Sequence, residues 1–280
     1  MTEKMIPPHI GRVALAVADL NRSVRFYRDV IGLSELDRAD DVVRMGVAGE
    51  PLLVLYGQPG ISRVRRATGL YHFALLLPSR AALGDTLQHL VEVGGPISGY
   101  ADHAVSEAIY LTDPDGHGIE IYRDRPRNEW TYPSGQLKMT VDPIDFDGVL
   151  AARTGQWNGL PEGTMMGHIH LQVSSIATTE QFYINLLGFD LVTRYGSGAS
   201  FLSANGYHHH FGTNTWAGVG LPPAPEDAAR LLWYEIREPH AAALETIAGR
   251  LDATGYPFER DTGELRVVDP SGIHIKLTAG

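Results

Sequence analysis

The sequence predicts an α+β protein that consists of two tandem domains, each holding two strand–helix–strand–strand–strand units. Residues 113–116 (Asp-Pro-Asp-Gly) form a tight-turn signal, and in the strand that follows Ile119 and Ile121 alternate with Glu120. The same signal returns 156 residues later at residues 269–272 (Asp-Pro-Ser-Gly), again ahead of an alternating apolar run. Short alternating segments recur around single helical segments along most of the chain, in the order strand, helix and then further strands.

The composition is typical of a globular chain. Of the 280 residues, 44% are hydrophobic and 20% are charged. The formal net charge of −10 argues against a nucleic-acid or anionic-membrane partner. The absence of cysteine excludes disulfides, thiolate metal sites and cysteine nucleophiles. Residues 1–8 lack an apolar signal region, and no apolar run approaches the ~18 residues of a membrane span. We therefore expect a cytoplasmic protein.

The first unit is expected within residues 9–60. Apolar alternation predicts a strand over residues 10–17, and Asp19 is expected to cap a helix over residues 20–30. Gly32 suits the left-handed position that ends such a helix. Two short strands, at residues 42–47 and 52–56, complete the unit before the turn at residues 58–60.

The second unit repeats this order. A strand is expected over residues 70–77, and Ser79 is expected to cap a helix that ends at the two glycines of residues 94–95. Strands follow near residues 97–100, 108–111 and 119–122. Residues 128–164 are rich in Pro and Gly with weak periodicity, so we expect a connector draped over the first domain, with a short helix near residues 147–153.

The rest of the chain repeats the beginning. Residues 167–173 match residues 11–17, and Phe182-Tyr183 matches Phe26-Tyr27, both at the spacing of 156. Farther along the spacing becomes 161, which aligns Pro78 with Pro239. Such agreement indicates an internal duplication. We divide the chain into a first domain, residues 1–127, the connector, and a second domain, residues 165–280.

The chain has four such units, the Asp-Leu…Phe-Tyr…Gly-Leu opening of residues 19–33 and the Asp-Pro-Asp-Gly…Glu ending. In these three features it resembles the vicinal oxygen chelate superfamily. This superfamily includes glyoxalase I, antibiotic-resistance proteins and extradiol dioxygenases. The runs at residues 69–80 and 119–126 look most like the two-domain catechol 2,3-dioxygenases. The resemblance implies paired βαβββ modules that curl into cup-shaped sheets. It also implies an oxidoreductase that uses Fe(II) or Mn(II) to cleave a catechol-like aromatic.

The resemblance also implies a set of metal ligands on the first and last strands of the units. In the dioxygenases two His and one Glu hold the metal and leave open positions for substrate and oxygen. Carried over to the first domain, these positions hold His72 and Glu120, but the third holds Arg12, which cannot ligate a metal. An alternative is that Arg12 and Glu120 form an ion pair that replaces the metal.

The second domain offers a different partial set. Its first-strand position holds His168, whereas Trp233 and Lys276 stand at the other two. The run of residues 207–211 (Tyr-His-His-His-Phe), interpreted as a strand, places His208 and His210 on one face. His168 with either His210 or His208 is therefore a second candidate pair of ligands, and a neighbouring histidine is then available as the base.

Other residues are assigned roles by the same comparison. His103 and Tyr110 precede Glu120 as the acid–base His and Tyr do in the dioxygenases, and His208 is the candidate catalytic base. As residues that contact the substrate we expect Arg12, Trp233 and Tyr207.

Two other functions remain open from the sequence. A metal-free protein that binds a small aromatic or an antibiotic is favoured by Arg12, Trp233 and Lys276 at ligand positions. A rewired metalloenzyme, an isomerase or lyase, would use His168 and the histidine run. Exposed strand edges favour a homodimer.

Overall fold

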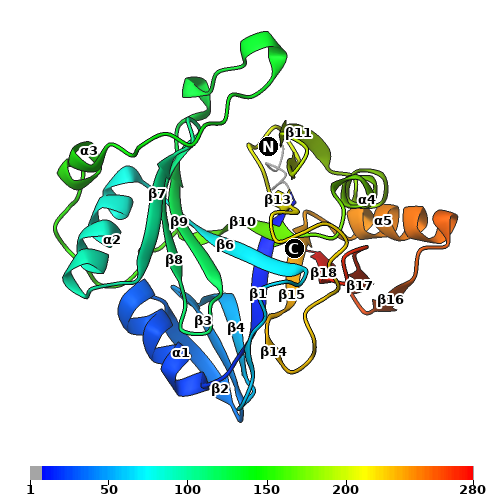
Figure 1. Cartoon of the computed structure of the whole chain (residues 1–280), viewed down its shortest axis with the longest axis horizontal. Coiled ribbons are helices and arrows are strands. Elements are labelled where there is room, and N and C mark those ends of the chain that lie inside the picture. Colours follow the sequence, from blue (N-terminus) through cyan, green and yellow to red (C-terminus); the bar gives the residue numbers. More distant parts are fainter. Residues whose placement is uncertain (1–7, 280) are drawn as a thin grey trace.

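The computed structural model describes residues 8–279 as two curved eight-stranded sheets with the helices at the periphery of the molecule (Figure 1). The predicted α+β class, with two cup-shaped sheets built from paired units, is confirmed. Each of the four units begins with a strand and a helix and continues with the remaining strands. No helix in the described part of the chain is long and apolar enough to cross a membrane.

The first two units occupy the N-terminal part of the chain. The elements of the first are β1 (His9–Val17), α1 (Leu20–Phe26), the π-helical turn η1 (Tyr27–Ile31), β2 (Ser34–Ala39), β3 (Val42–Val47) and β4 (Glu50–Gly57). The elements of the second are β6 (Gly69–Leu77), α2 (Arg80–Glu92), β7 (Ile97–Asp102), β8 (Ser106–Thr112) and β9 (Gly118–Asp124).

The last two units follow the connector in the same order. The elements of the third are β10 (Met165–Gln172), α4 (Ile176–Gln181), η4 (Phe182–Leu187), β11 (Asp190–Tyr195), β12 (Ala199–Ser203) and β13 (Phe211–Asn214). The elements of the fourth are β15 (Leu231–Glu238), α5 (Ala241–Thr254), β16 (Phe258–Asp261), β17 (Glu264–Val268) and β18 (His274–Ala279). A small two-stranded ribbon, β5 (Ser62–Arg63) and β14 (Ala228–Ala229), lies outside both sheets.

The predicted helix boundaries are set by local side chains. The Asp19 carboxylate accepts a hydrogen bond from the Arg22 amide at 2.9 Å, and the Ser79 hydroxyl accepts one from the Ala82 amide at 3.1 Å. Gly32 ends the first helical segment with φ of 92°, a left-handed conformation that favours glycine. These caps at Asp19, Ser79 and Gly32 confirm the expectation from sequence.

The two sheets do not follow the two halves of the duplication. One sheet has the order β16-β17-β18-β15-β1-β4-β3-β2, and the other has the order β11-β12-β13-β10-β6-β9-β8-β7. Each sheet therefore joins one unit from residues 1–127 to one unit from residues 165–280. The sequence division expected each half to close its own sheet. Alternation identifies strands, but which strand edges pair is settled only by tertiary contacts, here β1 with β15 and β6 with β10.

The duplicated Asp-Pro-x-Gly turns tie the two sheets together. Asp113 accepts hydrogen bonds from the backbone amides of Asp115 and His117, and the Tyr27 hydroxyl donates to it from the other sheet at 2.9 Å. Asp269 receives the matching bond from Tyr183 at 3.4 Å. The motif that reveals the duplication is therefore a structural link between sheets.

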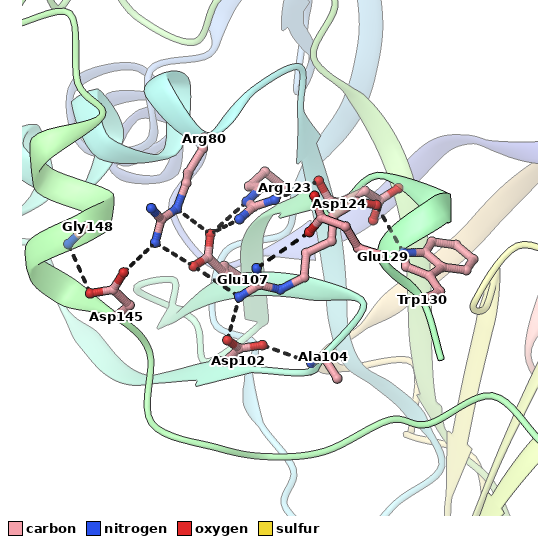
Figure 2. A network of polar contacts seen from close by, with 11 residues as sticks. Arg80, Asp102, Ala104, Glu107, Arg123, Asp124, Glu129, Trp130, Asp145 and Gly148 are labelled. Carbon is pink, nitrogen blue, oxygen red and sulfur yellow. Dashed lines mark hydrogen bonds and ion pairs between the residues drawn. The ribbon is translucent and has the colours of Figure 1, made fainter. Parts of the chain in front are cut away.

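The connector is fixed to the second unit by a network of charged side chains (Figure 2). The fully buried Glu107 of β8 accepts hydrogen bonds from Arg80 at 2.9 Å and from Arg123 at 2.7 Å. Arg80 also donates to Asp145, which caps the connector helix α3 (Phe146–Ala151) through the Gly148 amide. This helix lies where the sequence predicted one. The rest of the connector includes two short 3-10 turns, η2 (Arg127–Glu129) and η3 (Pro133–Gly135).

Candidate metal centre

Three buried side chains from three neighbouring strands converge in the sheet that contains β6, β9 and β10. The Nε2 atoms of His72 and His168 each lie 3.0 Å from the same Oε2 atom of Glu120. One candidate ligand atom from each of the three residues lies within 4.8 Å of the others. Among residues 8–279 this is the one group of three potential ligands that meets this spacing.

Strand register explains why these three residues meet. Ala74 of β6 pairs with Glu120 of β9 on one side and with His168 of β10 on the other. His72 lies two residues before Ala74, so its side chain is on the same face of the sheet. Gly167, just before His168, has no room for a side chain because the Tyr122 hydroxyl occupies that space. Glycine at this position therefore lets the Tyr122 side chain of β9 pack against β10.

The chemistry of this group fits a divalent transition metal. His72 Nε2 is buried and makes no hydrogen bond despite its approach to the carboxylate, so its lone pair has no protein partner. Burial lowers the pKa of His168 to about 4, which keeps the imidazole neutral and able to ligate at neutral pH. Burial alone would raise the pKa of Glu120, but His168 and His72 hold it well below its usual range. Two imidazoles and one carboxylate suit non-haem Fe(II) or Mn(II).

This geometry brings together residues that the sequence analysis assigned to two alternative sites. His72 and Glu120 come from the first half of the chain, and the missing third member is His168 from the second half. The ion pair suggested for Arg12 and Glu120 is absent from the described residues. Arg12 instead donates to both carboxylate oxygens of Glu235, at 2.7 and 2.8 Å, in the other sheet.

The other sheet carries the counterparts of the three ligands. Arg12, Trp233 and Lys276 stand at the positions equivalent to His168, His72 and Glu120. The Lys276 ammonium lies 4.1 Å and the Arg12 guanidinium 5.7 Å from the Trp233 ring centroid. The space that corresponds to the candidate metal centre is thus occupied by the Lys276 and Arg12 side chains packed against the Trp233 indole. Arg12 and Trp233, which we expected to contact the substrate, both lie in the sheet without the candidate ligands and do not line the cavity beside them.

A cavity of about 720 Å³ opens beside the candidate ligands. His72 and Glu120 line it, as do the aromatic side chains of Tyr71, Phe201 and Trp216. Residues 136–141 of the connector form part of its wall. The predicted draping of the connector over the first units therefore has a structural consequence, since it encloses the space next to the ligands.

His103 and Tyr110 both line this cavity. The backbone carbonyl of Thr140 in the connector lies 2.6 Å from His103 Nδ1, so this nitrogen must carry the proton. His103 Nε2 is then an acceptor, and the Tyr110 hydroxyl donates to it at 2.6 Å. Burial and the nearby Glu120 raise the pKa of Tyr110 well above its usual value, which keeps the phenol protonated.

The histidine run differs from the strand interpretation. Asn205 and Gly206 have positive φ angles, and β13 begins only at Phe211, so His208, His209 and His210 follow a turn and do not alternate as in a strand. All three are buried.

His208 and Tyr207 do not line the cavity. His208 Nε2 donates to Asp124 at 2.8 Å, and the Tyr207 hydroxyl donates to the same carboxylate at 3.3 Å. The roles expected for them, catalysis by His208 and substrate contact by Tyr207, are therefore not supported at this cavity. Asp124 holds both side chains away from the cavity lining.

His210 does not join the candidate ligands either. Its Nδ1 atom accepts a hydrogen bond from the Ala204 amide at 3.2 Å and lies 3.0 Å from the Ser203 hydroxyl. With Nδ1 engaged as an acceptor, Nε2 of the neutral ring carries the proton and has no lone pair for a metal.

Two histidines that sequence reasoning passed over line the cavity, His170 and His209. The His209 ring lies 4.1 Å from that of His168, and burial lowers the pKa of His209 well below its usual value. His170 packs edge to face against Tyr71, with ring centroids 5.0 Å apart. The spacing of His168 and His170 on one strand could have found His170, because residues two apart share a face. No comparable signal marked His209.

The chain belongs to the Glyoxalase/Bleomycin resistance protein/Dioxygenase superfamily, whose model matches residues 9–121. It is 44% identical over 274 residues to a Bacillus subtilis strain 168 protein named Catechol-2,3-dioxygenase, covering 95% of this chain and 96% of that protein.

Solved structures show the same fold. A putative dioxygenase from Bacillus subtilis superposes with a TM-score of 0.64 at 14% identity, covering 97% of this chain and 84% of that one. Glyoxalase I from Zea mays superposes with a TM-score of 0.60 at 16% identity, covering 97% of this chain and 92% of that one. At these identities the likeness concerns the fold alone.

Proposed function

We propose that this protein is an extradiol-type dioxygenase that cleaves a catechol-like aromatic with Fe(II) or Mn(II) held by His72, Glu120 and His168. The observation that carries the proposal is the buried group of two histidines and one glutamate beside a cavity of about 720 Å³. The name of the 44% identical relative, Catechol-2,3-dioxygenase, supports the same reaction.

The three protein ligands leave room for substrate on the cavity side. A bound divalent metal would supply a chelating centre for two vicinal hydroxyls and activate molecular oxygen. The planar side chains of Tyr71, Phe201 and Trp216 give the cavity walls suited to an aromatic ring. A small aromatic diol therefore matches both the ligands and the walls.

His209 is the residue we assign as the base that accepts a hydroxyl proton. Because His208 Nε2 donates to the Asp124 carboxylate, Nδ1 of the neutral His208 ring is an acceptor. It lies 2.7 Å from Nδ1 of His209, which must then be the donor. This leaves Nε2 of His209 with a free lone pair. Asp124 and His208 thus act as positioning residues that set the His209 tautomer.

Tyr110 is assigned to the opposite role. Its hydroxyl, which donates its one proton to His103, lines the same cavity as Glu120, and when rotated away from His103 it can donate that proton to an oxygen of the substrate instead. The Thr140 carbonyl keeps His103 in the tautomer that accepts from Tyr110.

The alternative function, binding of a small molecule without a metal, is no longer favoured by the residues on which it rested. It rested on Arg12, Trp233 and Lys276 at ligand positions, and these three lie together in the other sheet. The homodimer and the cytoplasmic location stay part of the proposal. The absence of cysteine is compatible with that location.

Oxygen uptake tests the proposed reaction. Protein purified without oxygen is loaded with Fe(II) or, in parallel, Mn(II), and is mixed with catechol. We expect one O2 consumed per ring opened, with both oxygen atoms found in the product by isotope-labelled mass spectrometry. His209→Gln is expected to lower kcat by roughly 10²-fold or more while the metal content stays unchanged. Metal-loaded protein that consumes no oxygen with any of a panel of substituted catechols would contradict the proposal.

A further inference from the structure

A second cavity, of about 750 Å³, lies at the ends of the central strands, away from the candidate metal ligands. It is bounded by the β5–β14 ribbon, by the start of β15 and by the turn before β18. None of His72, Glu120 and His168 lines it. The ribbon pairs residues 62–63 with residues 228–229, so the cavity is built by segments far apart in the sequence.

Three arginines surround this cavity without a carboxylate partner. Arg63, Arg65 and Arg230 line it, and no ion pair joins any of them to an acidic side chain among residues 8–279. Elsewhere in the described chain twelve arginines pair with a carboxylate. In a protein with a net charge of −10, most arginines can find a carboxylate partner, so three unpaired guanidinium groups around one cavity are unusual.

Arg230 is the most informative of the three. Its Nη1 atom is buried and has no hydrogen-bond partner in the described protein, whereas its backbone carbonyl is fixed by the Ala16 amide at 2.9 Å. Buried guanidinium donors are normally hydrogen-bonded, because desolvation without a partner is unfavourable. Glu226 is the one acidic side chain on the cavity wall, and it forms no ion pair with Arg230.

The cavity has a fixed frame. Ser62 and Arg63 pair with Ala228 and Ala229 in the parallel ribbon, which brings Arg63 next to Arg230 in space. The Thr68 amide donates to the Pro222 carbonyl at 2.9 Å, and the Thr68 hydroxyl donates to the Ser271 carbonyl at 2.6 Å. The backbones that carry the arginines are thus held by long-range hydrogen bonds, although the side chains of Arg63 and Arg65 reach solvent.

We propose that this cavity is a second binding site, which takes a small anion with at least two negative charges in carboxylate or phosphate form. Guanidinium groups bind both through paired, charge-assisted hydrogen bonds. Trp233 and Leu231 add an apolar wall, so a ligand with a short carbon skeleton fits as well as a free anion.

The second site touches the first. Arg63 and Gly116 line both cavities. Gly116 has a φ of 90°, and a Cβ atom added there would collide with Cδ of the Arg63 side chain. An anion that draws Arg63 toward Arg230 moves a group in the wall of the catalytic cavity. This coupling rests on the proposed function, whereas the anion site itself does not.

Direct binding tests the site without any assay of activity. The full-length protein is titrated by calorimetry with inorganic phosphate and, separately, with succinate, against sodium chloride at matched ionic strength. We expect saturable binding of phosphate or succinate to the wild type. The anion that binds shows whether the site takes a phosphate or a carboxylate ligand. Arg63→Gln and Arg230→Gln are each expected to weaken that binding at least tenfold. Arg66→Gln, which changes a neighbouring exposed arginine outside the cavity lining, is expected to leave it unchanged.

The outcomes separate the site from the metal centre. Binding must persist in His72→Ala, because the anion site does not include that residue. Absence of saturable binding by either anion overturns the proposal, as does binding equal in Arg63→Gln, Arg66→Gln and wild type. Loss of binding in His72→Ala would place the anion at the metal centre instead. Arg63 is exposed, so its variant gives an answer even when Arg230→Gln fails to fold.

Discussion

His72 and His168 come from opposite halves of the duplicated chain, and their ring centroids lie 5.5 Å apart beside one carboxylate. Neither half contains a complete set of ligands. The set is completed because β6 of the first half pairs with β10 of the second. The three ligand positions are thus kept once each, two in the first half and one in the second, while the counterpart positions in the other sheet hold Arg12, Trp233 and Lys276.

Tyr110→Phe is expected to slow the reaction without disturbing the site. The substitution removes only the hydroxyl that donates to His103 at 2.6 Å. Acid–base groups typically contribute about 10²–10⁴-fold, so we expect kcat to fall by about 100-fold or more, with little change in KM. Tyr100→Phe is the matched control, since Tyr100 lines the same cavity and no hydrogen bond to its hydroxyl is present in the described chain. Equal kcat values for the two variants would remove Tyr110 from the mechanism.

Glu235→Gln is expected to destabilise the fold while leaving the metal content unchanged. The Glu235 carboxylate accepts hydrogen bonds from Arg12 and from the Thr278 hydroxyl, and its side chain is almost fully buried. Weakening a largely buried ion pair in this way should lower the free energy of unfolding by about 1–3 kcal/mol, measured by urea denaturation. The exposed pair of Glu245 and Arg260 is the control, and Glu245→Gln should change the free energy of unfolding by less than about 1 kcal/mol.

The same carboxylate predicts a loss of stability in acid. Burial alone would raise the pKa of Glu235, but the hydrogen bonds from Arg12 lower it to about 2, from an ordinary value of 4.5. Its contribution is fully present above pH 4.5 and is lost as the pH falls toward 2. The stability difference between the wild type and Glu235→Gln should therefore shrink over that range. A difference independent of pH would show that the charge of Glu235 is not what stabilises the fold.

Glu238 predicts the opposite pH dependence. Burial raises the pKa of this carboxyl from 4.5 to about 7, only partly offset by Arg250. Because the buried site accepts the neutral carboxyl more readily than the charged one, protonated Glu238 favours the folded state. Its contribution to stability is fully present below pH 4.5 and is lost as the pH rises through about 7. Glu238→Gln should therefore gain stability relative to the wild type between about pH 5 and pH 8, by on the order of 2 kcal/mol. Glu259→Gln, at a side chain that is 79% exposed, should show no such trend. A constant difference for Glu238→Gln across the range would contradict the assignment.

What the sequence could predict was local. The strands, the caps at Asp19 and Ser79 and the stop at Gly32 follow from side chains that act on their own backbone. The pairing of β6 with β10 could not be predicted, because it joins distant strand edges that carry no mark of their partner. For that reason His72, Glu120 and His168 were each identified as ligands but were assigned to two separate sites.

The interpretation of the histidine run as a strand was wrong for a related reason. Asn205 and Gly206 adopt left-handed conformations and turn the chain, so alternation does not apply to residues 208–210. The orientation of each ring is set by distant partners, Asp124 for His208 and Ser203 for His210. His209 is left facing the cavity. Long-range contacts of this kind leave no local signal in the sequence.

The most direct test of the account is the metal content of protein purified without oxygen, measured by elemental analysis for the wild type and single variants. We expect about one Fe or Mn per chain in the wild type and in His274→Ala, whose side chain is exposed. His72→Ala, Glu120→Ala and His168→Ala should each retain less than about a tenth of it, with circular dichroism unchanged. Metal retained by His168→Ala, or lost from a folded His210→Ala, would contradict a site shared between the two halves.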